Sequence, residues 1–544
     1  MKKQLKRNVS AAVLAVLFLI LAGCKASRQE SSRAAKSETG TIDRLVIGTT
    51  TDLEAPSRSV YNFDVFSGTL MQMAPVWMDE FGEFHPLLTE YEMVNPGVWR
   101  FKVIEGMAWH DGQPLTAEDI KFTIEYGALQ STGKPQTTYS ALNIIDEKTI
   151  EMVLNVPNVR HLSGLTTLRI LPKHIFETVE VMADASEAQH TVGCGPYKFV
   201  SFDHAAGTVE FAANENYPRG SPRVKTIVFR IFGSPDTLHM ALKNGEIDII
   251  YAYANGIGVA AAADLAAYDT IKLKAVKDTS NTAVFVFNNN RFPGNDINIR
   301  KAVAYAIDYD KFRELFGSEY STPSTEGFLP AGSLGYVDTP QLKRDLEKSK
   351  AFLAAFLAAF RAEAGAADTN GDGIVEYQGK ALSITLDMRN DLPVYQRYGE
   401  LLKANLAEAG IDLILKPEDV PTFRTITEQT HTHEAMISKF TAYGMGMQAG
   451  MGSAYLDGNN PSLAQGQIMD PAYGAIVSRL KSAVNLEEYT AAAGDCQRYY
   501  AETMPAIALF WDSYIQAYKA ELDGFVVDGT FGLLNMQTWY SITK

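Results

Sequence analysis

Apolar and polar positions follow two alternating patterns along this chain. Short runs rich in β-branched and aromatic residues, at 44–48, 149–154 and 226–231, predict strands. Segments with apolar residues at helical spacing, at 116–126 and 400–409, predict helices. No sequence repeat of fixed period is present. The alternation predicts a mixed α/β protein.

Local signals mark where several of these helices begin and end. Thr116 is a candidate N-cap, with Asp119 three residues later, and the helix over 400–409 stops at Gly410. The Ala-rich segment 350–365 looks like low complexity but carries an aromatic stripe at helical spacing, formed by Phe352, Phe356 and Phe360. Such a stripe on strong helix formers predicts a core-facing helix rather than a cofactor site.

The first 23 residues have the pattern of a lipoprotein signal peptide. A positively charged start precedes an apolar run over 9–22, which is too short to span a membrane and matches a signal core. The run ends in Leu21-Ala22-Gly23-Cys24, a lipobox in which small residues precede a Cys that is acylated. We therefore expect a mature protein that begins at Cys24, lies in the cell envelope and is lipid-anchored to the membrane, facing the periplasm or the cell exterior.

Length and charge indicate how many domains the protein has and which partners are excluded. Residues 24–40 are polar and predict a flexible tether with a reach of roughly 20–25 Å. The ~500 residues beyond it exceed what one hydrophobic core holds, so two or three domains are expected. Removal of the signal peptide takes away four positive and no negative charges and brings the net charge from −15 to −19. This acidic balance argues against nucleic acid as a partner.

The cysteines do not organise the fold. With Cys24 acylated, only Cys194 and Cys496 remain. They could pair in an oxidising compartment, but two cysteines this far apart in sequence do not establish a bridge. Their pairing stays open at this point.

The catalytic motifs that the chain imitates are all incomplete. His433-Glu434 begins like a zinc-protease helix, but the second His is missing. His431 and His433 could supply part of a metal site on a strand, and solvated loop histidines are the alternative. Gly444-Met-Gly446 resembles a dinucleotide fingerprint without the helix start that must follow it. Because no nucleophile is assembled with a base, the sequence predicts that the protein is not an enzyme.

The stretch DTNGDGIVE over 368–376 begins like a calcium loop. An EF-hand uses side-chain oxygens at loop positions 1, 3 and 5 and a Gly at 6, and the candidate ligands here are Asp368, Asn370, Asp372 and Glu376. Position 12, which needs a bidentate Glu, is Gly379. The alternative is a tight turn that satisfies its own backbone. We expect no cofactor, with a structural calcium ion at this loop as the second interpretation.

Residues 99–126, WRFKVIEGMAWHDGQPLTAEDIKFTIEY, resemble the signature of the family 5 extracellular solute-binding proteins, the peptide- and nickel-binding receptors of ABC importers. The turn Trp109-His110-Asp111-Gly112 and the helix start Pro114-Leu-Thr-Ala-Glu-Asp119 carry the resemblance. In this context His110 and Asp111 are fold residues rather than a catalytic pair. Further blocks similar to the family follow in order, at 193–199, 216–217, 241–248, 299–308 and the DTNGDG segment itself.

The resemblance implies an α/β, two-lobed periplasmic-binding-protein-like fold with a hinge and three discontinuous subdomains. Carried onto this chain, the core of lobe 1 comprises 41–56, 191–278 and 498–544. Residues 57–190 form a subdomain inserted into lobe 1, and residues 279–497 form lobe 2. A ligand is then expected where the lobes meet.

The resemblance also implies ligand-binding residues. Arg389 matches an Arg that clamps a ligand carboxylate in peptide-binding members, and a surface Arg at a strand end is the alternative. Positions that line the first lobe or lie at the hinge are matched by Arg58, Tyr61, Phe63 and Trp511.

One part of the expected site departs from the family. Peptide-binding members hold the peptide amino terminus with an Asp, but residues 440–451 contain no carboxylate, and the first one after them is Asp457. A buried ammonium without an anion costs several kcal/mol, so capture of a free amine is not expected here. The flexible Gly/Met-rich loop suits a varied ligand face, with pocket candidates Tyr443, Met445 and Met447.

The leading hypothesis is a monomeric, lipid-anchored substrate-binding protein of an ABC transporter. It would capture a peptide or peptide-like solute and deliver it to membrane permease subunits driven by their ATPases. A nickel or metal-chelate receptor is the alternative within the family, motivated by His431, His433 and the Met-rich loop. A surface lipoprotein that serves as a sensor or in adhesion is the alternative outside transport.

Overall fold

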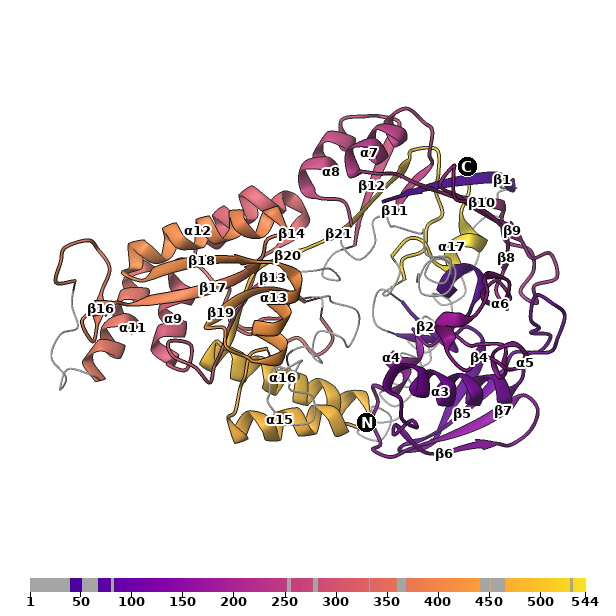
Figure 1. The fold of residues 1–544 in the computed structure, drawn as a ribbon, viewed down its shortest axis with the longest axis horizontal. Coiled ribbons are helices and arrows are strands. Elements are labelled where there is room, and N and C mark those ends of the chain that lie inside the picture. The colour runs from indigo at the N-terminus through magenta and orange to yellow at the C-terminus, as the bar shows by residue number, and fades with distance from the viewer. Residues whose placement is uncertain are drawn as a thin grey trace, which may run out of the picture.

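The computed structural model describes residues 40–50, 67–79, 83–251, 256–276, 282–331, 333–359, 368–440, 451, 465–528 and 532–544. These residues build three main sheets, which Figure 1 shows distributed over two bodies. We call the body with the seven-stranded and four-stranded sheets the first lobe and the body with the six-stranded sheet the second lobe. No helix in the described part is long and apolar enough to cross a membrane.

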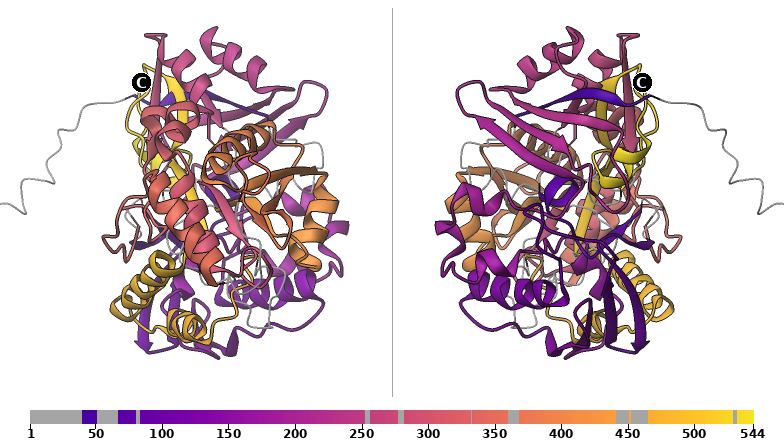
Figure 2. Two further views of the ribbon diagram at one scale, coloured as in Figure 1. Left: turned by 90° about the vertical axis from the view of Figure 1, so that its left-hand side faces the viewer. Right: turned by 90° about the vertical axis from the view of Figure 1, so that its right-hand side faces the viewer.

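The seven-stranded sheet is assembled from segments far apart in the sequence. Its order is β12-β21-β11-β1-β10-β9-β8. The strands are β1 (Ile42–Thr49), β8 (Tyr197–Asp203), β9 (Thr208–Ala213), β10 (Val224–Ile231), β11 (Ile249–Tyr251), β12 (Ile271–Val276) and β21 (Tyr514–Lys519). Helix α17 (Met536–Ser541) packs on one face through Trp539, while α7 (Pro235–Lys243) and α8 (Val259–Ala266) pack on the other through Leu238 and Leu265. The C-terminus lies close to the start of β1 (Figures 1 and 2).

A smaller antiparallel unit completes the first lobe. Its sheet has the order β4-β5-β7-β6, formed by β4 (Thr89–Asn95), β5 (Val98–Val103), β6 (Tyr139–Ile144) and β7 (Thr149–Leu154). Helix α3 (Ala117–Thr132) and the short α4 (His161–Leu165) cover one face of this sheet through a core that includes Phe101, Ile120 and Leu165. The hairpin β2 (Val76–Met78) and β3 (Phe84–Pro86) lies beside this core.

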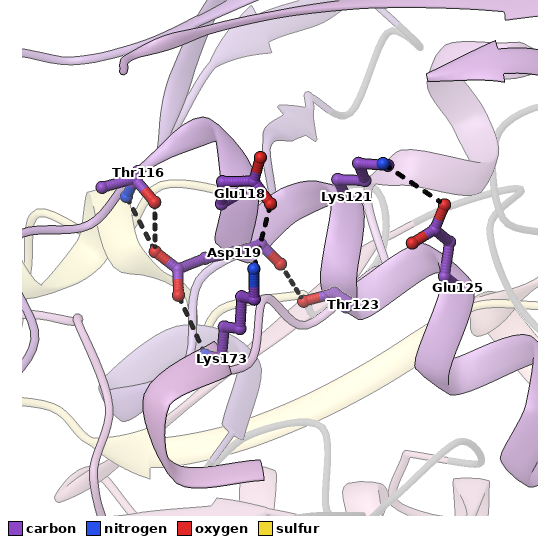
Figure 3. A network of polar contacts seen from close by, with 7 residues as sticks. All are labelled: Thr116, Glu118, Asp119, Lys121, Thr123, Glu125 and Lys173. Atoms are coloured by element: carbon purple, nitrogen blue, oxygen red, sulfur yellow. Dashed lines mark hydrogen bonds and ion pairs between the residues drawn. The ribbon is translucent and has the colours of Figure 1, made fainter. Parts of the chain in front are cut away.

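The predicted start of α3 is confirmed in atomic detail. Asp119 reaches back so that its carboxylate accepts hydrogen bonds from the Thr116 backbone N–H at 2.8 Å and from the Lys173 N–H at 2.9 Å (Figure 3). One buried carboxylate thereby fixes the helix N-terminus and joins it to α5 (Lys173–Phe176). The short helices α6 (Glu187–His190) and η3 (Met182–Asp184) follow along the chain.

The six-stranded sheet forms the centre of the second lobe. Its order is β14-β20-β13-β19-β17-β18, with β13 (Thr282–Phe287), β14 (Ser321–Thr322), β17 (Ser383–Arg389), β18 (Asp412–Glu418), β19 (Ala435–Phe440) and β20 (Ala506–Asp512). Strand β13 shows the period of two: Phe285 and Phe287 face one core, and Val284 and Val286 face the other. Both faces of the sheet are therefore buried.

Helices cover the two faces of this sheet as separate layers. One layer is formed by α9 (Ile297–Ala306), α11 (Leu346–Ala359) and α12 (Pro393–Ala409), and the other by α13 (Val420–Arg424), α15 (Pro471–Ser482) and α16 (Leu486–Thr503). The predicted end of the helix at Gly410 is confirmed, since this residue has a φ of 92° that favours glycine. In α11, Phe356 is buried and Phe352 stacks on Tyr305, as the stripe predicts; Phe360 lies outside the described residues.

Short elements connect these layers. They are η2 (Ser67–Met71), α10 (Tyr309–Phe312), η4 (Arg313–Gly317), η5 (Ser318–Tyr320), β15 (Glu376–Tyr377), β16 (Lys380–Ala381) and η6 (Thr425–Gln429).

The resemblance to the family also correctly assigned His110 to the fold. Its Nδ1 accepts the Gly193 N–H at 3.2 Å, and its Nε2 lies 3.0 Å from the Gly195 carbonyl oxygen.

Two strand connections join the lobes. Strand β20 of the second lobe continues through Ser513 directly into β21 of the first, and β12 is followed, after residues 277–281, by β13. The backbone N–H of Ser513 donates to the Tyr320 carbonyl at 2.9 Å. These adjacent crossings are the position expected for a hinge, because few residues would have to change conformation for the lobes to move.

Candidate functional site

Strand directions identify the edge of the second lobe that faces the first. Strands β19 and β20 are both antiparallel to β13, and β17 and β18 run parallel to β19. All four strands therefore point the same way. Because β20 leaves its sheet toward the first lobe, the carboxyl ends of all four strands lie on that side (Figure 1).

The first lobe has the matching arrangement. Strands β10 and β11 run parallel to β1, and β12 shares their direction because both β11 and β12 are antiparallel to β21. Since β12 leads toward the second lobe, the carboxyl ends of these four strands face it. Ligands of open α/β sheets bind beyond the carboxyl ends of the strands. The junction where the two sets of strand ends converge is therefore the candidate binding site.

Most of the predicted pocket residues belong to connections that leave these strand ends. Residues 51–66, which include Arg58, Tyr61 and Phe63, follow β1, and residues 441–450, which include Tyr443, Met445 and Met447, follow β19. Both segments lie outside the described residues, as does Cys24. The described ends of β1 and β19 lie at the junction, and the roles of the side chains in the two segments remain predictions.

Arg389 is the last residue of β17 and thus lies at the junction where the carboxyl ends of the strands converge. Its guanidinium makes a two-point contact with Asp391, in which Nε donates to Oδ1 at 2.9 Å and Nη2 donates to Oδ2 at 2.5 Å. The hydrogen bond to Asp391 raises the pKa of Arg389 above its usual range. About a third of the side chain, 35%, is exposed. A ligand carboxylate would therefore meet a guanidinium that is already oriented, with Nη1 still able to donate.

Trp511 is packed within the second lobe. It lies in β20 with none of its surface exposed. Its Nε1 donates to the Phe328 carbonyl oxygen at 3.0 Å, and its ring meets the Phe328 ring edge-on. The described contacts give Trp511 a packing role next to the crossing strand, and contact with a ligand stays a prediction.

The side chains of the calcium-like loop are engaged by the loop itself. Asp368 accepts the backbone N–H groups of Gly371 and Gly373, and Asn370 Oδ1 accepts that of Asp372. Glu376 accepts the Thr369 N–H at 2.7 Å. These bonds make a turn that satisfies its own backbone. In the described part of the chain, the group of three side chains whose ligand atoms gather within 4.8 Å lies elsewhere, at Asp79, Glu83 and His85.

The two histidines that motivated a metal receptor lie at the other edge of the second-lobe sheet. They precede β19, so they sit at its amino end, away from the converging carboxyl ends. The rings of His431 and His433 are 6.4 Å apart, and His433 Nε2 lies 2.8 Å from the Gln465 carbonyl oxygen. Burial lowers the pKa of His433. This placement does not favour them as ligands of a solute held between the lobes.

The two cysteines do not pair. Cys194 is buried in the core of the antiparallel unit and Cys496 in α16, and both are free thiols. Burial raises the pKa of each thiol to about 12, so neither is a reactive thiolate at neutral pH.

Sequence reasoning missed one group of side chains near the junction. Arg160 and His161 at the start of α4 line one cavity together with Lys481 of α15, which belongs to the other lobe. No local sequence pattern indicates this grouping, because Arg160 and His161 are far from Lys481 in the sequence. A signal could be found only in the tertiary structure.

Comparisons with known proteins fit this architecture. The profile of "Bacterial extracellular solute-binding proteins, family 5 Middle" matches residues 83–462. The chain is 26% identical over 439 residues to the oligopeptide-binding protein AppA of Bacillus subtilis, which covers 76% of each chain. The solved structures described next are less than 25% identical to this chain, so their similarity concerns the fold alone.

Two solved structures illustrate that fold. The periplasmic binding protein DppA of Helicobacter pylori, in complex with the peptide STSA, has a TM-score of 0.71 and 17% identity, covering 93% of this chain and 99% of its own. NikZ of Campylobacter jejuni, in complex with Ni(L-His), has a TM-score of 0.73 and 19% identity, covering 92% and 99%. The predicted two-lobed α/β fold is confirmed. The chain belongs to the bacterial extracellular solute-binding proteins of family 5.

Proposed function

We propose that this protein is the substrate-binding receptor of an ABC importer and that its solute is a peptide or peptide-like molecule held between the lobes. The observation that carries the proposal is the convergence of eight strand carboxyl ends from two lobes joined by two adjacent crossings. The similarity to the oligopeptide-binding protein AppA over three quarters of the chain supports a peptide as the solute. Transport energy would come from the partner ATPases, and this chain would perform no chemistry.

Arg389 is the proposed clamp for the carboxylate of the peptide. It stands at the converging edge, and Asp391 holds its guanidinium in a fixed plane. A guanidinium held in this plane loses little side-chain entropy when Nη1 and the remaining N–H of Nη2 donate to a ligand carboxylate. Because residues 440–451 offer no carboxylate, the peptide amino group is not proposed to be bound as an ammonium ion.

Calorimetry with a peptide library, followed by modified forms of the best peptide, tests this proposal. Amidation of the carboxyl terminus should weaken binding about tenfold or more, the size of a lost charged hydrogen bond. Acetylation of the amino terminus should leave the affinity unchanged. Arg389→Gln should cause the same loss as amidation, and amidation should cost nothing further in that variant.

A matched control variant is available on α16. Arg498 forms a similar local contact with Asp495, at 2.5 Å, away from the converging strand ends. Arg498→Gln should therefore bind the free-acid peptide as the natural sequence does. If no peptide in the library binds, or if Arg389→Gln and Arg498→Gln weaken binding equally, the proposed clamp is wrong.

The envelope location and partners complete the proposal. The family consists of extracellular proteins, and we propose that acylation at Cys24 anchors this one to the membrane beside its permease. Metabolic labelling with a radioactive fatty acid should mark the natural protein and leave Cys24→Ala unlabelled. Uptake of a labelled peptide by cells should then require both this protein and the permease.

A metal-chelate receptor is the second candidate, because NikZ shares the fold. The position of His431 and His433 at the amino end of β19 does not support it. Elemental analysis of the purified protein after incubation with nickel and histidine distinguishes the two candidates. A stoichiometric metal content would favour the chelate receptor over the peptide receptor.

A further inference from the structure

The hairpin of β2 and β3 in the first lobe brings together three side chains that can bind a metal ion. Asp79 directly follows β2, Glu83 directly precedes β3, and His85 is the second residue of β3. One ligand atom of each side chain lies within 4.8 Å of the other two. In the described part of the chain this is the one group of three histidine, cysteine or acidic side chains with such spacing. It lies apart from the strand ends that form the candidate solute site.

The backbone fixes the two acidic residues relative to each other. The Asp79 N–H donates to the Glu83 carbonyl oxygen at 3.0 Å, and the Glu83 N–H donates to Asp79 Oδ1 at 2.9 Å. On its other side, Asp79 forms an isolated antiparallel bridge with Asp528. The positions of both acidic residues are therefore set without an ion, which lowers the entropic cost of binding one.

The imidazole of His85 is oriented by two contacts. Its Nε2 lies 2.8 Å from Asp79 Oδ2. Its ring stacks on that of Trp77, its cross-strand partner, with 4.8 Å between the ring centroids and 28° between the planes. The side chain of His85 is 39% exposed, so an ion can reach it from solvent. One ring nitrogen thus already points at the carboxylate with which it would share an ion.

The spacing and the ligand types indicate the class of ion. Zinc binds histidine nitrogen and carboxylate oxygen at about 2.0–2.2 Å, so two ligands of one zinc ion lie about 3–4 Å apart. The three side chains are close to this spacing, and the exposed side chain of Glu83 can rotate to reach it. One imidazole with two carboxylates suits an ion of the zinc class, whereas magnesium and calcium prefer oxygen ligands alone.

A second histidine–aspartate pair shows what the third ligand adds. His174 Nε2 lies 2.7 Å from Asp111 Oδ2, with 37% and 34% of the two side chains exposed. Within the described residues, no further histidine, cysteine or acidic side chain completes a group of three around this pair. The pair at His174 is therefore a surface hydrogen bond of similar geometry that lacks the donor supplied by Glu83.

We propose that Asp79, Glu83 and His85 form a binding site for a divalent metal ion of the zinc class. The ion takes the place of the proton between His85 Nε2 and Asp79 Oδ2, and the metal-bound ring carries its proton on Nδ1. Glu83 supplies the third ligand, and water completes the tetrahedral shell. The hydrogen bond from the Glu83 N–H to Asp79 Oδ1 stays in place, so the carboxylate of Asp79 serves the hairpin and the ion together.

The position of the site gives the bound ion a structural consequence. Phe84 lies between Glu83 and His85 in the sequence and packs against the apolar core of the second lobe. An ion that joins the two ends of the hairpin loop holds this segment in its folded conformation. Because the ion binds the folded chain through residues that are brought together only there, zinc should raise the thermal midpoint.

Isothermal titration calorimetry of the full chain, freed of metal with EDTA and dialysed, is the measurement, and zinc chloride is the probe. The expected result is one zinc ion per chain and a higher thermal midpoint with zinc. Magnesium and calcium chloride should give no saturable binding at this site. X-ray absorption at the zinc edge should show one histidine nitrogen among oxygen ligands.

Variants of the three ligands locate the bound ion. Asp79→Asn, Glu83→Gln and His85→Gln should each weaken zinc binding about tenfold or more. Glu83→Gln is the variant least able to disturb folding, because the side chain is exposed and both backbone hydrogen bonds of residue 83 remain. His174→Gln is the matched control and should bind zinc as the natural sequence does.

The outcomes separate this site from the proposed peptide site. Loss of zinc binding in the three ligand variants, with His174→Gln unchanged, supports the proposal. It is overturned if the chain binds no zinc, if Glu83→Gln and His85→Gln bind zinc as the natural sequence does, or if His174→Gln loses as much affinity. None of these results bears on peptide binding, since Arg389 and the strand ends take no part. Nickel taken up with histidine belongs to this site if His85→Gln abolishes it, and to a chelate held between the lobes if the variant retains it.

Discussion

The backbone N–H of Val159 donates a hydrogen bond to the carbonyl oxygen of Ala483 at 2.7 Å and so joins the two lobes away from the crossing strands. Val159 belongs to the antiparallel unit, and its side chain packs against the apolar core of the second lobe. This contact is separate from the two strand connections that join the lobes at the hinge. The two lobes are therefore in contact at Val159 as well as at the hinge.

Val159→Asp should weaken this second attachment. A carboxylate placed against an apolar core has to be hydrated, which favours separation of the lobes. We expect solution scattering to show a larger radius of gyration and calorimetry to show a peptide affinity about tenfold lower. Val181→Asp is the control, since Val181 is 50% exposed in the same lobe. Equal scattering curves for the two variants would contradict this role of Val159.

Asp119 should be a major local determinant of stability. Asp119→Ala leaves the backbone N–H groups of Thr116 and Lys173 without their acceptor and removes the Asp119 half of the capping box (Figure 3). We expect a loss of about 2–4 kcal/mol in the free energy of unfolding, measured with urea. Glu125→Ala, which removes an exposed partner of Lys121 at 3.8 Å, should change it by less than about 0.5 kcal/mol.

His110 should make stability depend on pH. Burial lowers its pKa to about 4, whereas an unfolded histidine titrates near 6.5. Since Nδ1 accepts the Gly193 N–H, the proton of the neutral ring belongs on Nε2, which donates to Gly195. The unfolded chain therefore binds more protons between about pH 6.5 and 4, and stability should fall as the pH falls through this window.

Urea unfolding at pH 7 and pH 5 measures this effect against a variant. His110→Gln should be less stable than the natural sequence at pH 7 because it loses the two contacts. Its loss of stability on going to pH 5 should be smaller by about 1–2 kcal/mol, since one titrating group is removed. An identical pH dependence in both proteins would show that His110 does not titrate on unfolding.

Removal of calcium should leave the protein unchanged. Asp368, Asn370 and Glu376 already accept hydrogen bonds from the loop backbone, so the turn does not need a cation to hold its shape. We expect the same thermal midpoint with EGTA and with millimolar calcium. A midpoint several degrees higher with calcium would instead assign these side chains to an ion.

Local sequence signals predicted much of the fold because their physical causes are local. The cap formed by Thr116 and Asp119, the stop at Gly410 and the period of two in the strands all act within a few residues. The resemblance to a family added the two-lobed architecture, which no local pattern contains. The boundaries proposed for the inserted subdomain, 57–190, remain predictions. The return to lobe 1 was placed too early at residue 498, because α16 and β20 keep the chain in the second lobe up to Asp512.

Less of the candidate site than of the fold could be predicted from the sequence. Arg389 could be placed at a strand end, but its contact with Asp391 depends on side-chain conformation. Trp511 was assigned by position, and only the packing reveals that its indole N–H belongs to Phe328. The cavity lined by Arg160 and Lys481 depends on how the two lobes pack against each other. No single segment of the sequence encodes that packing.

Native mass spectrometry of the protein, purified without unfolding, tests the central claim most directly. The account predicts an intact complex heavier than the chain by the mass of a peptide or peptide-like solute, which is released on denaturation. After removal of that solute, addition of the same peptide should restore the mass shift. A chain that carries no solute as purified and gains none from a peptide library would contradict the claim that it is a peptide receptor.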